Sequence, residues 1–105
     1  MNLVELKLEE LISKNIDSIS GRTTGQNYAQ DKKIMDSIDS TKYVIIISPK
    51  IKAINDSFIK GFFSEVFKKY RTKEKVQEKF TVQGEAYFVD LFNKNFSILE
   101  SISNS

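Results

Sequence analysis

The chain has 105 residues, of which 40% are hydrophobic and 29% charged, with a formal net charge of +2 at pH 7. These values are typical of a single globular domain over residues 1–105, and the charge is too small to indicate a nucleic-acid binder by itself. The chain contains no Cys and no His, so it lacks disulfides, thiolate and imidazole metal ligands, and the commonest catalytic base. We therefore expect no metal site, no cofactor and no enzymatic activity.

The N-terminal region predicts two things, a β-strand and a cytoplasmic location of the protein. Its first residues lack the apolar core of a signal sequence, and no run of the chain approaches transmembrane length. Apolar and charged residues alternate from Leu3 to Leu8, which indicates a half-buried strand. A short helix over Glu9–Lys14 would follow, and one helix over the whole N-terminal region is the alternative.

A polar stretch between Asn15 and Asn27 predicts a loop, which we place at Ser18–Gly25 because Gly21 and Gly25 interrupt any regular pattern. The stretch contains neither the Walker sequence nor Gly-x-Gly-x-x-Gly, so it is not a recognisable phosphate cradle. The Arg22 guanidinium could still donate hydrogen bonds to a carboxylate or phosphate.

Helical spacing returns after this loop. The apolar residues that share the spacing are Tyr28, Ile34, Met35 and Ile38. They predict a second helix, which Asp39-Ser40-Thr41 would end before the next strand.

The stretch Tyr43–Tyr70 organises the chain. Val44–Ile47 is short, apolar and unalternated, which predicts a strand buried on both faces. The apolar residues after it recur at steps of one, three and four: Phe58, Ile59, Phe62, Phe63, Val66, Phe67 and Tyr70. This spacing predicts an amphipathic helix, and a buried strand that leads into such a helix is half of a βαβ unit.

Polar residues stand where this helix begins. Asn55, Asp56 and Ser57 belong to the residue types that cap helix N-termini. A helix N-terminus also attracts anions, including a phosphoryl group attached to Ser57 itself. Two interpretations therefore stay open at this position, a structural cap and a phosphorylation or interaction site.

The C-terminal third predicts a charged connection over Arg71–Lys79, a strand at Phe80–Val82 closed by Gly84, and a helix over Glu85–Asn93. The last segment, 96–105, is either a strand or a further helical turn, and residues 103–105 are expected to fray. Strands and helices alternate throughout, so we predict an α/β domain with a three- to four-stranded sheet and packed helices.

Positive charge is concentrated in one part of this region. Its members are Lys68, Lys69, Arg71, Lys73, Lys75 and Lys79. Such a cluster is either a solvated helix end or a basic patch that binds phosphate.

The motifs around the central helix resemble a known family. A strand followed by Asn55-Asp56-Ser57-Phe58 and an amphipathic helix is similar to the STAS domain of anti-sigma-factor antagonists, in which a Ser at the start of the corresponding helix is phosphorylated. The resemblance is closer to the bacterial STAS-like domain of unknown function. It rests on Ser20-Gly21-Arg22, Gly25 with Tyr28, and Ser57-Phe58 with the later Phe63, and it covers about Leu6 to Val82.

The resemblance implies a non-enzymatic regulatory module that contacts a protein partner of the ATP-binding, histidine-kinase-like class. Its contact surface would include the helix start at Ser57 and the Ser20–Gly25 loop. No membrane would take part in this interaction. The alternative hypothesis is a nucleic-acid or nucleotide-phosphate binder that uses Arg22 and the basic cluster. Salt distinguishes the two hypotheses, because phosphate contacts weaken steeply as ionic strength rises.

Overall fold

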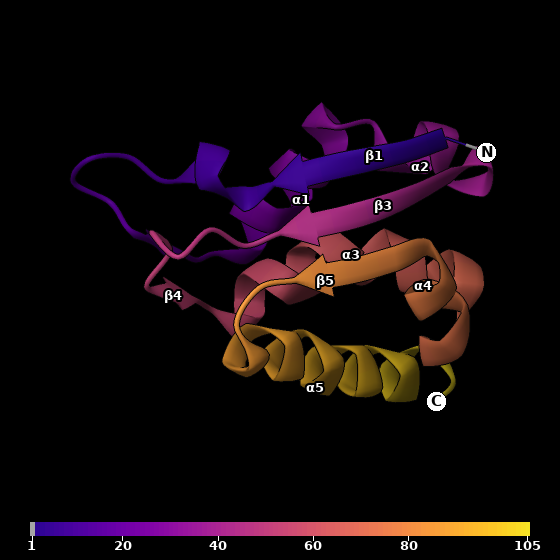
Figure 1. The fold of residues 1–105 in the computed structure, drawn as a ribbon. Coiled ribbons are helices and arrows are strands. Elements are labelled where there is room, and N and C mark those ends of the chain that lie inside the picture. Colours follow the sequence, from indigo (N-terminus) through magenta and orange to yellow (C-terminus); the bar gives the residue numbers. More distant parts are fainter. Residues whose placement is uncertain (1) are drawn as a thin grey trace.

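The computed structural model describes residues 2–105, and strands alternate with helices along the chain (Figure 1). The strands are β1 (Asn2–Lys7), β2 (Ser18–Ile19), β3 (Thr41–Ile46), β4 (Ala53–Ile54) and β5 (Phe80–Gln83). The α-helices are α1 (Arg22–Asp31), α2 (Ile34–Ser37), α3 (Asp56–Tyr70), α4 (Lys73–Lys79) and α5 (Ala86–Ser103). Two short 3₁₀ helices are η1 (Leu8–Leu11) and η2 (Ile38–Ser40). The predicted α/β class is therefore confirmed.

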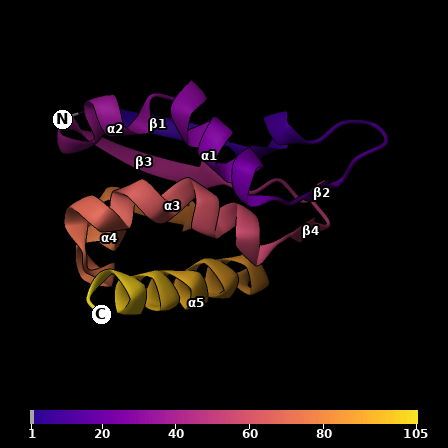
Figure 2. The same cartoon turned by 180° about the vertical axis from the view of Figure 1, so that it is seen from behind.

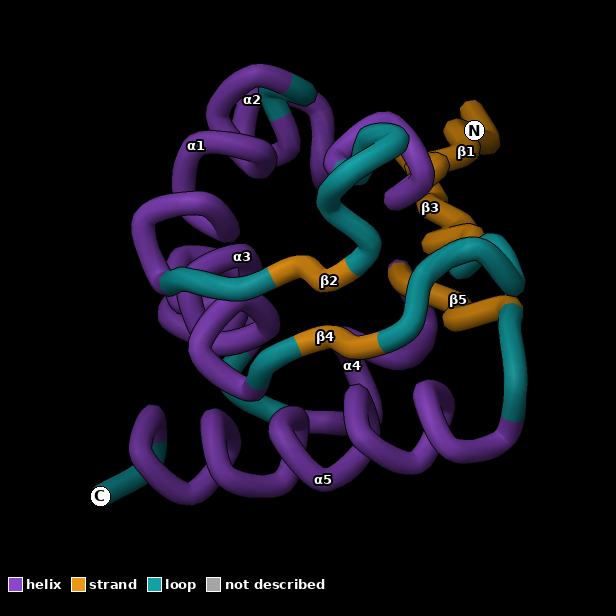
Figure 3. Tube along the Cα trace, turned by 90° about the vertical axis from the view of Figure 1, so that its left-hand side faces the viewer, coloured by secondary structure: helices purple, strands orange, loops and turns teal. Residues whose placement is uncertain are grey.

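The main sheet has three parallel strands in the order β1-β3-β5. Each crossover moves one strand further in the same direction, and right-handed crossovers then place their helices on the same face of the sheet. Figure 1 shows α1 and α3 behind the three strands, and Figure 3, turned by 90°, shows both helices to the left of the strands. The opposite face of the sheet carries no helix within the described residues.

This single-sided cover corrects the prediction for the central strand. Tyr43 and Ile45 of β3 are buried, whereas Lys42 is exposed and both Val44 and Ile46 are only half-buried. The strand is therefore not buried on both faces. Helices normally cover both faces of an all-parallel sheet, and strands in such sheets are continuous apolar runs. The unalternated apolar run of β3 was interpreted by this rule.

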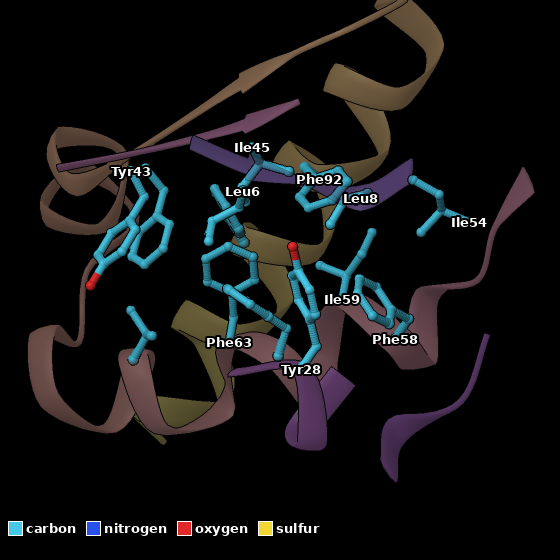
Figure 4. Close-up of a cluster of buried hydrophobic side chains, with 14 of the residues drawn as sticks. Leu6, Leu8, Tyr28, Tyr43, Ile45, Ile54, Phe58, Ile59, Phe63 and Phe92 are labelled. Carbon is cyan, nitrogen blue, oxygen red and sulfur yellow. The ribbon is translucent and has the colours of Figure 1, made fainter. Parts of the chain in front are cut away.

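The core lies between the sheet and α3, and α5 closes it from the side (Figures 2 and 4). The ring of Phe63 on α3 packs edge-on against Phe80 of β5 and Phe96 of α5, with centroid separations of 5.0 and 4.7 Å. Phe62 and Phe67 are also buried, so the helical face predicted from the spacing is confirmed.

The N-terminal half follows the predicted order with different boundaries. β1 confirms the predicted strand and excludes a single N-terminal helix, and the following turn is η1 rather than a helix over Glu9–Lys14. The predicted Ser18–Gly25 loop is wrong, because Ser18 starts β2 and α1 begins at Arg22. The second predicted helix is also divided, since Lys33 adopts a left-handed conformation (φ 54°) between α1 and α2.

The C-terminal half contains more helix than predicted. The charged connection after Tyr70 is largely α4, which Thr72 caps by accepting a hydrogen bond from the N–H of Lys75 at 3.2 Å. The ambiguous segment 96–105 is helical up to Ser103, where α5 ends. Next to this end, the Asn104 amide donates to the carbonyl of Arg71 at 2.9 Å, and the fraying of residues 103–105 stays a prediction.

Candidate functional site

The two short strands outside the main sheet align the starts of two helices. β2 and β4 pair in parallel, Ser18 with Ala53 and Ile19 with Ile54. β2 leads into α1 and β4 leads into α3, so the ladder places both helix N-termini side by side, as Figure 3 shows. The N–H of Asn55 extends the ladder by donating to the carbonyl of Ile19 at 2.8 Å.

Two glycines let α1 and α3 approach closely next to this ladder. A Cβ atom added at Gly25 would lie 2.2 Å from the carbonyl oxygen of Phe58, and one at Gly61 would lie 2.1 Å from that of Arg22. Real side chains do not reach such distances, so the first turns of the two helices pack backbone against backbone. The close approach fixes Arg22 and Ser57 on one surface.

The Ser57 hydroxyl joins the two helix starts directly. Its Oγ accepts a hydrogen bond from the N–H of Gly21 at 3.2 Å and donates to Oδ1 of Asn55 at 3.0 Å. The same Asn55 oxygen accepts from the N–H of Ser57 at 3.0 Å, which confirms Asn55 as the N-cap of α3. Ser57 is half-buried, so its hydroxyl has both internal partners and an approach from solvent.

The N-terminus of α1 differs electrostatically from that of α3. Gly21 offers α1 no side-chain cap, and the first turn of α1 contains no acidic residue. Arg22, Thr23 and Thr24 are exposed in that turn. Because the N–H groups of a first turn have no partner inside their helix, this end carries a partial positive charge next to the Ser57 hydroxyl.

Asp56, at the first position of α3, is held by α5. Its Oδ1 accepts from the Asn95 amide at 3.1 Å, and its Oδ2 accepts from Nζ of Lys94 at 3.4 Å. The Asn95 hydrogen bond is the main reason why the pKa of Asp56 lies below its usual value, and Lys94 lowers this pKa further. Asp56 is therefore ionised at neutral pH and ties α5 to the edge of the site.

The structure thus brings two sequence-predicted groups together. One is Asn55, Asp56 and Ser57, and the other is Ser20, Gly21, Arg22 and Gly25. We call the surface formed by Ser20–Thr24 and Asn55–Ser57 the helix-start face, after the N-termini of α1 and α3.

The basic cluster is separate from this face. It begins in the last turn of α3, with Lys68 and Lys69, and α3 has 15 residues and is about 22 Å long. Five of its six members have internal partners: Lys68 pairs with Glu65, Lys69 with Asp39, Arg71 with the carbonyl of Ser103, Lys73 with Ser97, and Lys79 with the carbonyl of Asp39. Arg71 and Lys73 therefore contact α5, whereas Lys69 and Lys79 contact Asp39 of η2.

The sequence prediction missed two residues that shape the site, Asn95 and Gly61. Asn95 is completely buried, and it stands on the apolar face of α5 between Phe92 and Phe96. A polar residue in such a stripe is the sequence signal that could have drawn attention to it. Gly61 gives no comparable signal, because its role depends on α1, a distant segment of the chain.

No family model matches the chain, and no curated protein or solved structure matches it in the corresponding searches. Among residues 2–105, no group of three or more His, Cys, Asp or Glu side chains is arranged to hold a metal ion. None of the helices in this same range is long and apolar enough to cross a membrane.

Proposed function

We propose that the protein is a cytoplasmic, non-enzymatic regulatory module of STAS-like type that binds a protein partner through the helix-start face. The observation that carries the proposal is the hydrogen bond from the N–H of Gly21 to Oγ of Ser57, which unites the two candidate segments in one surface. The partner class implied by the family resemblance is an ATP-binding, histidine-kinase-like protein.

The same contact supports regulation by phosphorylation of Ser57. A phosphoryl group on Oγ would carry nearly two negative charges beside the uncapped first turn of α1. The phosphoryl oxygens would also compete for the hydrogen bond that the N–H of Gly21 now donates to Oγ of Ser57. Phosphorylation would therefore change both the charge of the surface and the contact between its two halves, without introducing charge into the hydrophobic core.

The nucleic-acid hypothesis receives less support from the geometry. Arg22 lies on the helix-start face, whereas the basic cluster begins in the last turn of α3. Lys68, Lys69 and Arg71 are each engaged by an oxygen of the same chain. A continuous phosphate track from Arg22 to these side chains would have to cover the length of α3.

The proposal is tested by affinity capture from the native host, with the captured proteins identified by mass spectrometry. Arg22→Glu reverses a charge on the helix-start face, and Lys75→Glu makes the same change in the basic cluster. We expect the first variant to lose a partner that the wild type and the second variant retain. Equal capture by all three forms, or loss only with Lys75→Glu, would contradict the proposed surface.

A further inference from the structure

The β1 edge of the main sheet is open. β1 pairs only with β3, and Figures 1 and 3 show no element beyond it in the plane of the sheet. Its six residues leave a row of backbone N–H and C=O groups without strand partners on that side. The strand has no Pro or Gly to disrupt pairing, and Leu3 and Val4 are 68% and 38% exposed.

We propose that this edge pairs antiparallel with β1 of a second copy of the chain. Such pairing would join two three-stranded sheets into one of six strands, in the order β5-β3-β1-β1-β3-β5. A two-fold axis perpendicular to the sheet relates the copies, so their helices lie on one side and their open faces on the other. The backbone hydrogen bonds of the added ladder provide the affinity.

The charge pattern of β1 favours a second copy of the same strand as the pairing partner. Glu5 and Lys7 point to the same face of the strand because they are two residues apart. Neither forms an ion pair with another described residue. In an antiparallel pair with the two-fold axis at Leu6, each Glu5 lies directly opposite Lys7 of the other copy, which gives two reciprocal ion pairs.

Other registers lose this complementarity. With the axis at Glu5, the two Glu5 carboxylates would face each other, which is destabilising. With the axis at Val4, Glu5 would face Leu3 and its charge would stay unpaired. With the axis at Leu6 the two strands overlap over residues 5–7, because β1 ends at Lys7 and Leu8 is buried at the start of η1. The sequence of β1 therefore complements itself in one register.

Sedimentation velocity over a concentration series tests the proposal. We expect the wild type to pass reversibly from a 12.1 kDa monomer to a dimer as concentration rises. Glu5→Lys and Lys7→Glu each turn two attractive pairs into two repulsive ones, so each should weaken the dimer by about tenfold or more. Circular dichroism verifies that the variants stay folded, which is expected because both side chains are exposed.

Two combinations of these substitutions distinguish this register from any other contact between two copies of the chain. An equimolar mixture of the single variants should form a heterodimer, because the lysines of one chain face the glutamates of the other. The double variant Glu5→Lys/Lys7→Glu should dimerise like the wild type. A wild type that stays monomeric at every concentration, single variants that dimerise normally, or a mixture that fails to associate would each overturn the proposal.

Discussion

A methyl group added at Gly61 probes the contact that builds the helix-start face. The Cβ of a Gly61→Ala variant would lie 2.1 Å from the carbonyl oxygen of Arg22, whereas ordinary contacts begin at 3.4 Å. The first turn of α1 must therefore move away from α3 by about 1.3 Å. The ladder between β2 and β4 resists this movement, because both strands end directly before the two helices.

The expected cost combines two opposing effects. Overpacking typically destabilises a protein by about 1–3 kcal/mol, and here the atom that is struck belongs to the backbone and cannot rotate away. Replacement of Gly by Ala inside a helix otherwise stabilises by about 1 kcal/mol. Since the clash is severe, we expect Gly61→Ala to lower the free energy of unfolding by about 2 kcal/mol.

Urea unfolding followed by circular dichroism measures this loss, and the amide resonance of Gly21 reports the local displacement. Ser64→Ala is the matched control, because Ser64 lies one turn further along α3 and makes only a hydrogen bond to the carbonyl of Gly61, at 3.3 Å. An unchanged or increased stability of Gly61→Ala would refute the close packing of α1 on α3. An unmoved Gly21 resonance would refute the coupling of this packing to the site.

Three further predictions concern the rest of the molecule. Phe62→Ala should lower the free energy of unfolding by about 3–5 kcal/mol and Lys68→Ala by less than about 1 kcal/mol, and equal urea midpoints would contradict the core assignment. The Tyr70 hydroxyl donates a hydrogen bond to the Asp39 carboxylate at 2.6 Å, and this bond is the main cause of the lowered pKa of Asp39. Tyr70→Phe should therefore raise the titration midpoint of Asp39 measured by NMR. An unchanged midpoint would exclude this hydrogen bond. Fluorescence anisotropy with short oligonucleotides should show binding no tighter than about 10⁻⁴ M at physiological salt, and micromolar binding that depends on the basic cluster would favour the nucleic-acid hypothesis.

The lowered pKa of Asp39 also fixes the sign of one pH effect. A carboxyl whose pKa is lower in the folded state stabilises the fold above its unfolded pKa, here near the ordinary value of 3.8. This contribution disappears as the pH falls from that value through the folded pKa. In Tyr70→Phe, the free energy of unfolding should therefore fall less steeply as the pH is lowered through this range. Contributions from the rest of the chain should not change.

Sequence patterns predicted the parts of the fold that local chemistry determines. The spacing from Phe58 to Tyr70 identified α3, and the preference of Asn for N-cap positions anticipated the side-chain cap by Asn55. The start of α1 was missed because Gly21 and Gly25 are typical of loops. Gly25 is needed there for close contact with Phe58, which depends on a segment more than thirty residues away.

The remaining errors have similar physical causes. α4 was interpreted as a connection because Val76 is its only buried residue and the rest of the helix is charged or polar. The uncovered face of the sheet depends on the direction of successive crossovers, which the composition of β3 does not encode. In the candidate site, the residue types were predictable, but the pairing of Ser57 with Gly21 depends on the β2–β4 ladder.

The most direct test of the proposed function is the affinity of the captured partner for Ser57→Asp and Ser57→Ala, measured by isothermal titration calorimetry. Both variants should stay folded, with stability changed by about 1 kcal/mol or less, because Ser57 lies in the first turn of α3 and an anion is favourable there. We predict that Ser57→Asp changes the binding free energy by about 2 kcal/mol or more relative to Ser57→Ala, since charge is added at the centre of the contact. Equal binding by the two variants would contradict a regulatory role and leave Ser57 as a link between two helices.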